Sequence, residues 1–268
     1  MKIDKDLAVL TRAGSSFGLE YLRRLREKDI KPSLLCVEIT PLKKRIKTAK
    51  FLAKKIGIVD AFKYNIVFWK PIILRNISFG LLNPLPNYEG LAEKVVYCKN
   101  INDSTIVESL FNNNIKKVVL AQSGIIREPI LNIKDLWIIN CHPGRLPDYR
   151  GVDVIKWALV KKGPIEVTLH VVRAGIDTGE ILEKKLIPVV DTDHWTDVEK
   201  RAINTSIDLL VDASINGSGR YKLIPNEYKS NGKQYYLMPY KMLEKLNVEW
   251  PSIRDFYVRS KDNDYNNG

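Results

Sequence analysis

Residues 7–39 read LAVLTRAGSSFGLEYLRRLREKDIKPSLLCVEI, and this stretch decides the fold class. It opens with the apolar run Leu7–Thr11, continues with apolar residues at helical spacing, and ends in a second apolar run at 33–39. Ser15 or Ser16 can cap the helix, because a serine side chain accepts a hydrogen bond from the first turn. A strand, a helix and a strand within about 40 residues are the βαβ signature of a parallel sheet.

The same pattern continues along the chain. Further apolar runs predict strands at 94–98, 117–120 and 136–140, with a helix at 103–112. Runs this apolar are typical of strands that helices cover on both faces. Residues 165–171 and 180–190 instead alternate between apolar and polar side chains, which is typical of half-exposed antiparallel strands. The sequence therefore predicts an α/β protein with a Rossmann-like, mainly parallel sheet.

Two segments lie outside this repeat. Residues 40–93 form an insertion after the second strand that is longer than one crossover helix needs. Residues 191–259 are expected to form a C-terminal helix and a small appendage, in which residues 196–199 fit a capping box. Residues 260–268 are polar and predict a disordered tail. The main domain is therefore expected to span 1–190.

Composition narrows the class of protein. With 268 residues, 45% of them hydrophobic and 28% charged, the chain can bury a core, which excludes disordered and disulfide-scaffold classes. No apolar run reaches the roughly 18 residues of a membrane span, and the charged start lacks an apolar signal core, so a cytoplasmic protein is expected. Cys36, Cys98 and Cys141 form no CxxC pair, which favours buried, reduced thiols.

The positive charge is concentrated in the insertion. Residues 41–80 hold ten basic side chains and one acid, Asp60, so that this segment accounts for most of the net charge of +12. Residues 42–56 have the spacing of a basic amphipathic helix. Such a cluster indicates either a partner that carries phosphate, on RNA, a nucleotide or a membrane surface, or a solvated helix face. The sequence leaves both interpretations open.

The usual motifs for nucleotides and hydrolases are missing. The first turn has Gly14 and Gly18 but not GxGxxG, and the chain contains neither a P-loop nor a GxSxG elbow. The cysteines also lack the spacing of a metal site. An anion at the N-terminus of the first helix stays an alternative.

Residues 138–151, IINCHPGRLPDYRG, are the most informative segment for function. Asn140 and His142 stand two residues apart, so a strand projects both to the same side. They lie at the carboxyl end of that strand, where open α/β sheets place their sites. Without further evidence, both residues could be purely structural, with His142 capping the end of the strand and Asn140 forming hydrogen bonds to the backbone of the loop.

Residues 173–180, RAGIDTGE, form a predicted tight turn between two strands. Its one aspartate, Asp177, stands between two glycines and by itself would be a turn residue. His170, in the preceding strand, and His194, in a polar loop, are interpreted as structural.

Taken together, these segments resemble one family. Asn-x-His-Pro, Leu-Pro-x-Tyr-Arg-Gly and Gly-Ile-Asp-Thr-Gly resemble the formyltransferases that use N10-formyltetrahydrofolate. Members act on glycinamide ribonucleotide, methionyl-tRNA or nucleotide-linked amino sugars. The resemblance covers roughly 6–190 and is strongest over 116–190. It implies formyl transfer to a primary amine by a one-carbon transferase.

The resemblance also implies roles for particular residues. Asn140, His142 and Asp177 would be catalytic, and no metal would be needed. The folate donor would contact two segments, whose residues are Ser123, Gly124, Ile125 and Ile126 in one and Gly175, Thr178 and Gly179 in the other. Arg145 stands where members more often carry a neutral residue, and it is a candidate contact for the acceptor. The chemistry fits these side chains, since an amide and an imidazole can donate to a developing oxyanion and an imidazole can move the proton.

Among acceptors, an amino sugar on a nucleoside diphosphate is favoured. Glycinamide ribonucleotide enzymes are expected to be shorter than this chain. Methionyl-tRNA formyltransferases carry a C-terminal β-barrel of about a hundred residues. The residues after Trp195 include a predicted helix and hardly fit such a barrel. A hydrolase that releases formate and an RNA-binding protein that keeps the fold are the alternatives from other classes. A homodimer is left open.

Overall fold

The computed structural model describes residues 1–41, 46–48, 50, 51, 53, 54, 57, 60 and 87–265. The chain divides into two compact units, one of residues 1–116 and 121–130 and the other of 117–120 and 131–268. Most of the basic segment 41–80, and with it most of the helix expected at 42–56, lies outside the described residues.

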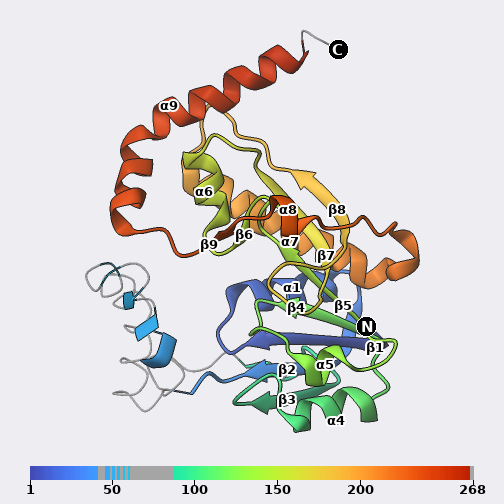
Figure 1. Cartoon of the computed structure of the whole chain (residues 1–268). Helices are drawn as coiled ribbons and strands as arrows, with labels where there is room; N and C mark the ends of the chain where they lie inside the picture. The colour runs from blue at the N-terminus through green and yellow to red at the C-terminus, as the bar shows by residue number, and fades with distance from the viewer. Residues whose placement is uncertain are drawn as a thin grey trace. The chain divides into compact units, whose positions relative to one another are not determined.

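The first unit is built on three parallel strands, in the order β3-β2-β1 (Figure 1). They are β1 (Lys2–Arg12), β2 (Ile30–Glu38) and β3 (Lys94–Cys98). Helix α1 (Ser16–Glu27) connects β1 to β2 and packs against β2, and α4 (Ser104–Asn112) follows β3. The apolar runs at 7–10 and 34–37 are fully buried. The βαβ prediction is therefore confirmed, and its cause is the burial of two apolar runs against an amphipathic helix.

The turn between β1 and α1 depends on a serine cap and a close helix–strand contact. The Ser15 hydroxyl accepts a hydrogen bond from the Gly18 amide at 2.9 Å and donates one to the Gln122 side chain at 2.7 Å. A Cβ on Gly18 would stand 2.2 Å from the Thr11 hydroxyl, so the helix can approach β1 only with glycine there. Tyr88 stabilises the same turn, because its hydroxyl accepts from the Gly14 amide at 2.9 Å.

The second unit carries four strands in the order β4-β5-β7-β8. They are β4 (Lys117–Ala121), β5 (Trp137–His142), β7 (Glu166–Val171) and β8 (Ile181–Leu186). The pair β4 and β5 is parallel, and β7 pairs antiparallel with both β5 and β8. These pairings confirm the predicted change from parallel to antiparallel strands. A separate two-stranded parallel sheet joins β6 (Arg150–Gly151) to β9 (Gln234–Tyr235).

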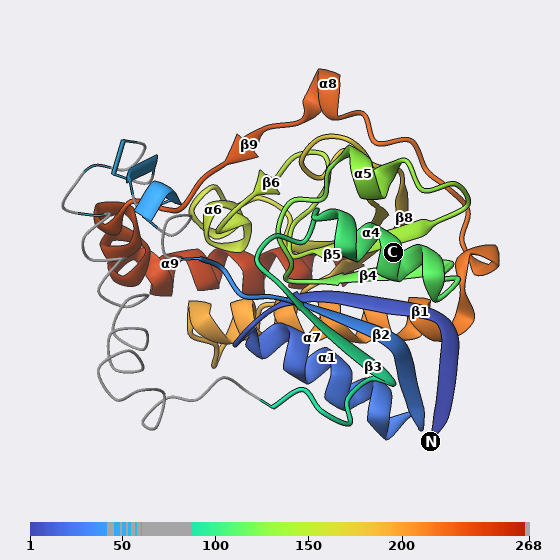
Figure 2. The same ribbon diagram turned by 90° about the horizontal axis from the view of Figure 1, so that it is seen from below.

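Helices complete the second unit. The longer ones are α6 (Val154–Val160), α7 (Trp195–Asn216) and α9 (Tyr240–Tyr265), and the short ones are α5 (Glu128–Leu131), η1 (Ser218–Arg220) and α8 (Tyr228–Asn231). Helix α7 packs against β5 and β7, and α9 contacts α6 and α7 (Figure 2). The C-terminal residues therefore belong to the same unit as β5 and β7, although the sequence had placed a boundary near 190.

Two details of the C-terminal part differ from the prediction. Helix α7 begins at Trp195 with His194 as its N-cap, because the capping box is formed by His194 and Asp197 instead of by residues 196–199. The expected disordered tail is helical as far as Tyr265. After Pro251 the sequence has no glycine or proline before Gly268 to end the helix.

The three cysteines carry free thiols. Cys36 and Cys141 are buried, and burial raises the pKa of each thiol to about 12, so both are protonated at neutral pH. None of the helices in the described part of the chain has the length and the apolar content that crossing a bilayer requires.

Candidate active site

The carboxyl end of β5 presents Asn140 and His142 on one face of the sheet. Register with the antiparallel strand β7 places Asn140 opposite His170, and His142 opposite Thr168. His142 is 3% exposed and Asn140 is half-buried. The i, i+2 spacing therefore gives the shared face that the sequence predicted.

His142 lies between a backbone carbonyl and a carboxylate. Its Nε2 is 2.7 Å from the carbonyl oxygen of Tyr149, and its Nδ1 is 3.5 Å from Oδ2 of Asp177. A carbonyl oxygen only accepts, so Nε2 must carry a hydrogen and donate it. In the protonated ring Nδ1 donates as well, to Asp177. The site can therefore accommodate a positive charge on this imidazole.

Asp177 connects the turn after β7 to the loop after β5. Its Oδ2 accepts a hydrogen bond from the Gly151 amide at 3.1 Å, and its Oδ1 is 3.7 Å from Nε2 of His170. The aspartate has a left-handed backbone, with φ of 52°, and its side chain is 13% exposed. The structure therefore brings Asn140, His142 and Asp177 together, as expected from the resemblance.

Glycine is required at position 151, the donor to Asp177. Gly151 has φ of 102°, which L side chains rarely adopt, and a Cβ there would stand 2.2 Å from the carbonyl oxygen of Tyr235. The Leu-Pro-x-Tyr-Arg-Gly motif thus ends in the glycine that lets β6 and β9 approach each other beside the carboxylate.

His170 is a site residue that the sequence reasoning missed. The ring is 2% exposed; its Nδ1 is 2.8 Å from the Val171 carbonyl oxygen, and its Nε2 is 3.2 Å from Nδ2 of Asn140. Burial lowers the pKa of His170 and outweighs the opposing effect of Asp177, so the ring is neutral and the 3.7 Å approach is no ion pair. With Nδ1–H donating to Val171, Nε2 accepts from the asparagine amide. His170 therefore orients one N–H of Asn140 and leaves the other available.

The segment expected to contact the folate pterin lies in the first unit. Gly124 is buried, and a Cβ on it would stand 3.0 Å from Oε2 of Glu38, whereas Ile125 is 59% exposed. The carbonyl oxygen of Ile125 accepts from the Asn102 amide at 2.9 Å, and Ser123 donates to the Gly124 carbonyl oxygen at 3.1 Å. These contacts hold Ser123–Ile126 in a fixed, irregular conformation.

The second predicted folate segment is the Gly175–Gly179 turn of the second unit. Gly175 has φ of 109°, and Thr178 donates from its hydroxyl to the Ala174 carbonyl oxygen at 2.9 Å. A Cβ on Gly179 would stand 1.8 Å from the Val171 carbonyl oxygen, so only glycine fits there. The two glycines of the motif are therefore explained by backbone geometry.

Arg145, the candidate contact for the acceptor, forms ion pairs within the protein. Its Nε is 2.9 Å from Asp148, and its NH1 is 3.4 Å from Glu166. Two carboxylates thus face one guanidinium. The sequence shows Asp148 three residues on, but Glu166 comes from another strand, and only the fold places it there.

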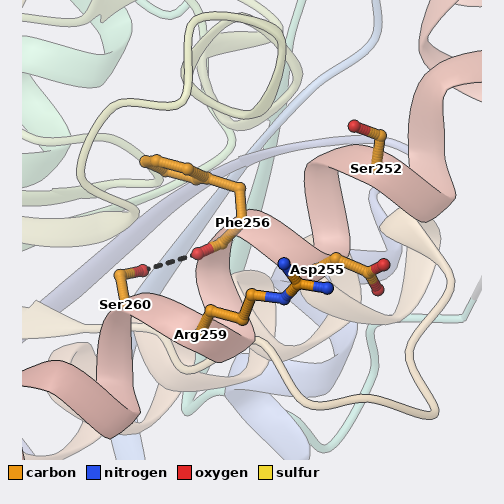
Figure 3. A pocket seen from close by; sticks show the side chains of 5 residues that line it. All are labelled: Ser252, Asp255, Phe256, Arg259 and Ser260. Carbon is orange, nitrogen blue, oxygen red and sulfur yellow. Dashed lines mark hydrogen bonds between the residues drawn. The ribbon is translucent and has the colours of Figure 1, made fainter.

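A hollow of about 590 Å³ on α9 contains none of these residues (Figure 3). It is lined by Ser252, Asp255, Phe256, Arg259 and Ser260, which lie along one side of a single helix. The Ser260 hydroxyl is already bonded to the Phe256 carbonyl oxygen at 2.8 Å. The chemistry therefore points to the end of β5 and not to this hollow.

An amide and two imidazoles beside a carboxylate, at the carboxyl end of a sheet strand, are suited to acyl transfer. Residues 5–213 match the family model described as formyl transferase. The chain therefore belongs to the formyl transferase family, and the resemblance of its motifs to that family is confirmed.

Relatives and solved structures agree with this assignment. The methionyl-tRNA formyltransferase of Caldanaerobacter subterraneus is 27% identical over 179 residues, which are 66% of this chain and 56% of that protein. That of Azobacteroides pseudotrichonymphae is 27% identical over 220 residues, 76% of this chain and 65% of the relative. The chain thus spans less than two thirds of the length of either relative.

Two solved structures show the same fold. A sugar N-formyltransferase from a Shewanella species superposes with a TM-score of 0.54 at 18% identity, covering 86% of this chain and 77% of that one. Glycinamide ribonucleotide transformylase 1 from Symbiobacterium toebii superposes with a TM-score of 0.51 at 18% identity, covering 81% of this chain and 93% of that one. The predicted fold class is therefore confirmed.

Proposed function

We propose that this protein transfers a formyl group from N10-formyltetrahydrofolate to a primary amine. The observation that carries the proposal is the position of the Asp177 carboxylate, within 3.5 Å of His142 and 3.7 Å of His170, in a chain of the formyl transferase family. Asn140 lies beside these groups. Its side-chain amide keeps one hydrogen for the substrate because Nε2 of His170 accepts the other.

The reaction forms one C–N bond and breaks another. The acceptor amine attacks the formyl carbon, and the carbonyl oxygen becomes an oxyanion in the tetrahedral intermediate. Asn140 donates its free amide hydrogen to that oxygen, and one such donor is typically worth about 2.7–4 kcal/mol. His142, with Asp177 balancing its charge, takes the proton that the amine loses and supplies one to N10 of the folate as the bond from N10 to carbon breaks. The products are the formamide and tetrahydrofolate.

Two segments are proposed to contact the folate: Ser123–Ile126 and the turn that holds Gly175, Thr178 and Gly179. Backbone groups in irregular segments can pair with the edge of a pterin. Hydrogen exchange with and without a folate analogue tests this, since both segments should become protected. Protection confined to residues 12–18 would instead indicate a nucleotide at the first turn.

We propose as acceptor an amino sugar carried on a nucleoside diphosphate. Support comes from the residues after Trp195, which fold into α7, α8 and α9 and include only the two-residue strand β9 within the described range 195–265. This is unlike the C-terminal barrel expected of methionyl-tRNA formyltransferases. A small molecule also needs no extended phosphate-binding surface.

Charged methionyl-tRNA is the second candidate acceptor, because the two relatives compared above are methionyl-tRNA formyltransferases. A panel of acceptors separates the candidates: nucleotide-linked amino sugars, glycinamide ribonucleotide, charged initiator tRNA, and water alone. We expect formamide from the first group. Formate release at the same rate with and without any amine would identify a hydrolase, and salt-dependent RNA binding without turnover would favour an RNA-binding protein.

A further inference from the structure

The turn that carries Asp177 is bonded by a residue outside the region that matches the family. The match ends at residue 213, and Asn226 lies in the extended segment between η1 and α8. Its Nδ2 donates to the carbonyl oxygen of Asp177 at 3.1 Å and to that of Gly179 at 3.0 Å. An amide NH₂ has two hydrogens, and here both are used on the two sides of one turn.

The orientation of this amide follows from its partners. Both are carbonyl oxygens, which only accept, so the NH₂ group and not the side-chain oxygen of Asn226 must face them. The backbone on either side is anchored as well. Ile224 and Ile181 exchange two backbone hydrogen bonds of 2.8 and 2.9 Å, and the Tyr228 amide donates to the Asn226 carbonyl oxygen at 2.8 Å. The amide is therefore fixed relative to the start of β8.

The turn needs such a contact. Asp177 and Gly175 both have positive φ, of 52° and 109°. An aspartate in the left-handed region persists when its surroundings determine its conformation. Within the turn, Thr178 donates to the Ala174 carbonyl oxygen and Arg173 donates to the Glu180 carboxylate, and neither bond reaches the carbonyl group of Asp177.

We infer that Asn226 is a positioning residue for formyl transfer, an inference that rests on the proposed function. By fixing the carbonyl groups of Asp177 and Gly179, it holds the Asp177 carboxylate against His142 and His170. A displacement of about 1 Å in a catalytic group can cost about 100-fold in rate.

The test is Asn226→Asp, which keeps the size of the side chain but replaces the donor with an oxygen that faces two carbonyl oxygens. We expect kcat to fall about 10- to 100-fold, with KM for the acceptor changed by less than about threefold, because no proposed acceptor contact lies in this turn. Asn226→Ala should lower kcat to a similar extent, and it replaces Asn226→Asp in the test if the aspartate variant does not fold. Added to Asp177→Asn, either substitution should cost little more, since it acts through that carboxylate. The control is Asn216→Ala, which removes an amide bonded to Asp212 at the end of α7.

Imidazole resonances give a readout that does not depend on turnover. The chain has three histidines, and His194 caps α7 away from this turn, so it is an internal reference. In both Asn226 variants the imidazole resonances of His142 and His170 should move from their wild-type positions at a fixed pH, while those of His194 stay unchanged. If the wild type is inactive on every amine but these shifts occur, the positioning contact stands and the proposed function fails. If the wild type is active and both variants keep its kcat and its imidazole resonances, the inference is wrong.

Discussion

Replacing Asp177 with asparagine tests the electrostatic part of the site. The two side chains have the same shape, and asparagine tolerates the left-handed backbone, φ of 52°, at least as well as aspartate. The new amide can keep an oxygen toward the Gly151 amide, which donates to Oδ2 at 3.1 Å. The geometry is therefore retained while the negative charge is lost.

The size of the effect follows from the distance between Asp177 and His142. Coulomb's law with an effective dielectric constant of about 20 gives roughly 5 kcal/mol for opposite charges 3.5 Å apart. Solvent screens the pair little, because the side chains are 4% and 13% exposed. The amide dipole recovers part of this energy, so we expect kcat to fall by about 10²–10³-fold, which corresponds to about 3–4 kcal/mol.

The assay is kcat at saturating donor and acceptor, with the formamide product separated and quantified. Asp135→Asn is the matched control, because Asp135 is also a left-handed aspartate, with φ of 60°, but is exposed in a turn before β5. It should keep wild-type activity. An Asp177→Asn protein that folds normally and retains more than a tenth of the wild-type kcat would refute the role assigned to this carboxylate.

Three further predictions concern stability. Ser15→Ala should lower the free energy of unfolding by about 0.5–2 kcal/mol in urea, because it removes the N-cap of α1, and an unchanged midpoint would contradict the cap. Gly151→Ala should lower the free energy of unfolding by about 1–3 kcal/mol or more and weaken activity, since the added Cβ collides with β9. The control Gly219→Ala, where nothing lies within 4 Å of the added Cβ, should leave the free energy of unfolding nearly unchanged. His170, whose pKa is lowered from 6.5 by burial, takes up a proton more readily when unfolded, so stability should fall as pH drops below about 6.5, by at most about 1.4 kcal/mol per pH unit. His170→Gln should make that decline shallower, and an unchanged slope would mean that the folded ring is not held neutral.

The sequence alone predicts most of the fold because its strands are apolar runs. The stretches at 7–11 and 33–39 have no other place than a sheet covered by helices, and the structure confirms both. Residues 94–98 also form a strand, but at the edge of the sheet, where they are exposed or half-buried. The tail was predicted less well, since polar composition at 260–265 indicated disorder, while continuation of α9 depends on the absence of a helix-ending residue.

The site could be predicted only in part. The spacing of Asn140 and His142 identifies a shared strand face, but their partners depend on register and on loops. His170 lies opposite Asn140 only because β7 pairs antiparallel with β5 at that register. Glu166 contacts Arg145 only because the fold places β7 beside the loop after β5. Asn226 lies in a segment whose sequence has no helical or strand periodicity. Contacts between strands and across irregular segments have no signal in a single sequence.

Following the formyl carbon itself tests most directly whether this protein is a formyltransferase. The protein is incubated with N10-formyltetrahydrofolate labelled in the formyl group and a nucleotide-linked amino sugar, with a His142→Ala variant in parallel. We expect one labelled formamide for each tetrahydrofolate released, at a rate at least about 100-fold lower in the variant. Label recovered only as formate, or equal transfer by His142→Ala, would contradict this expectation.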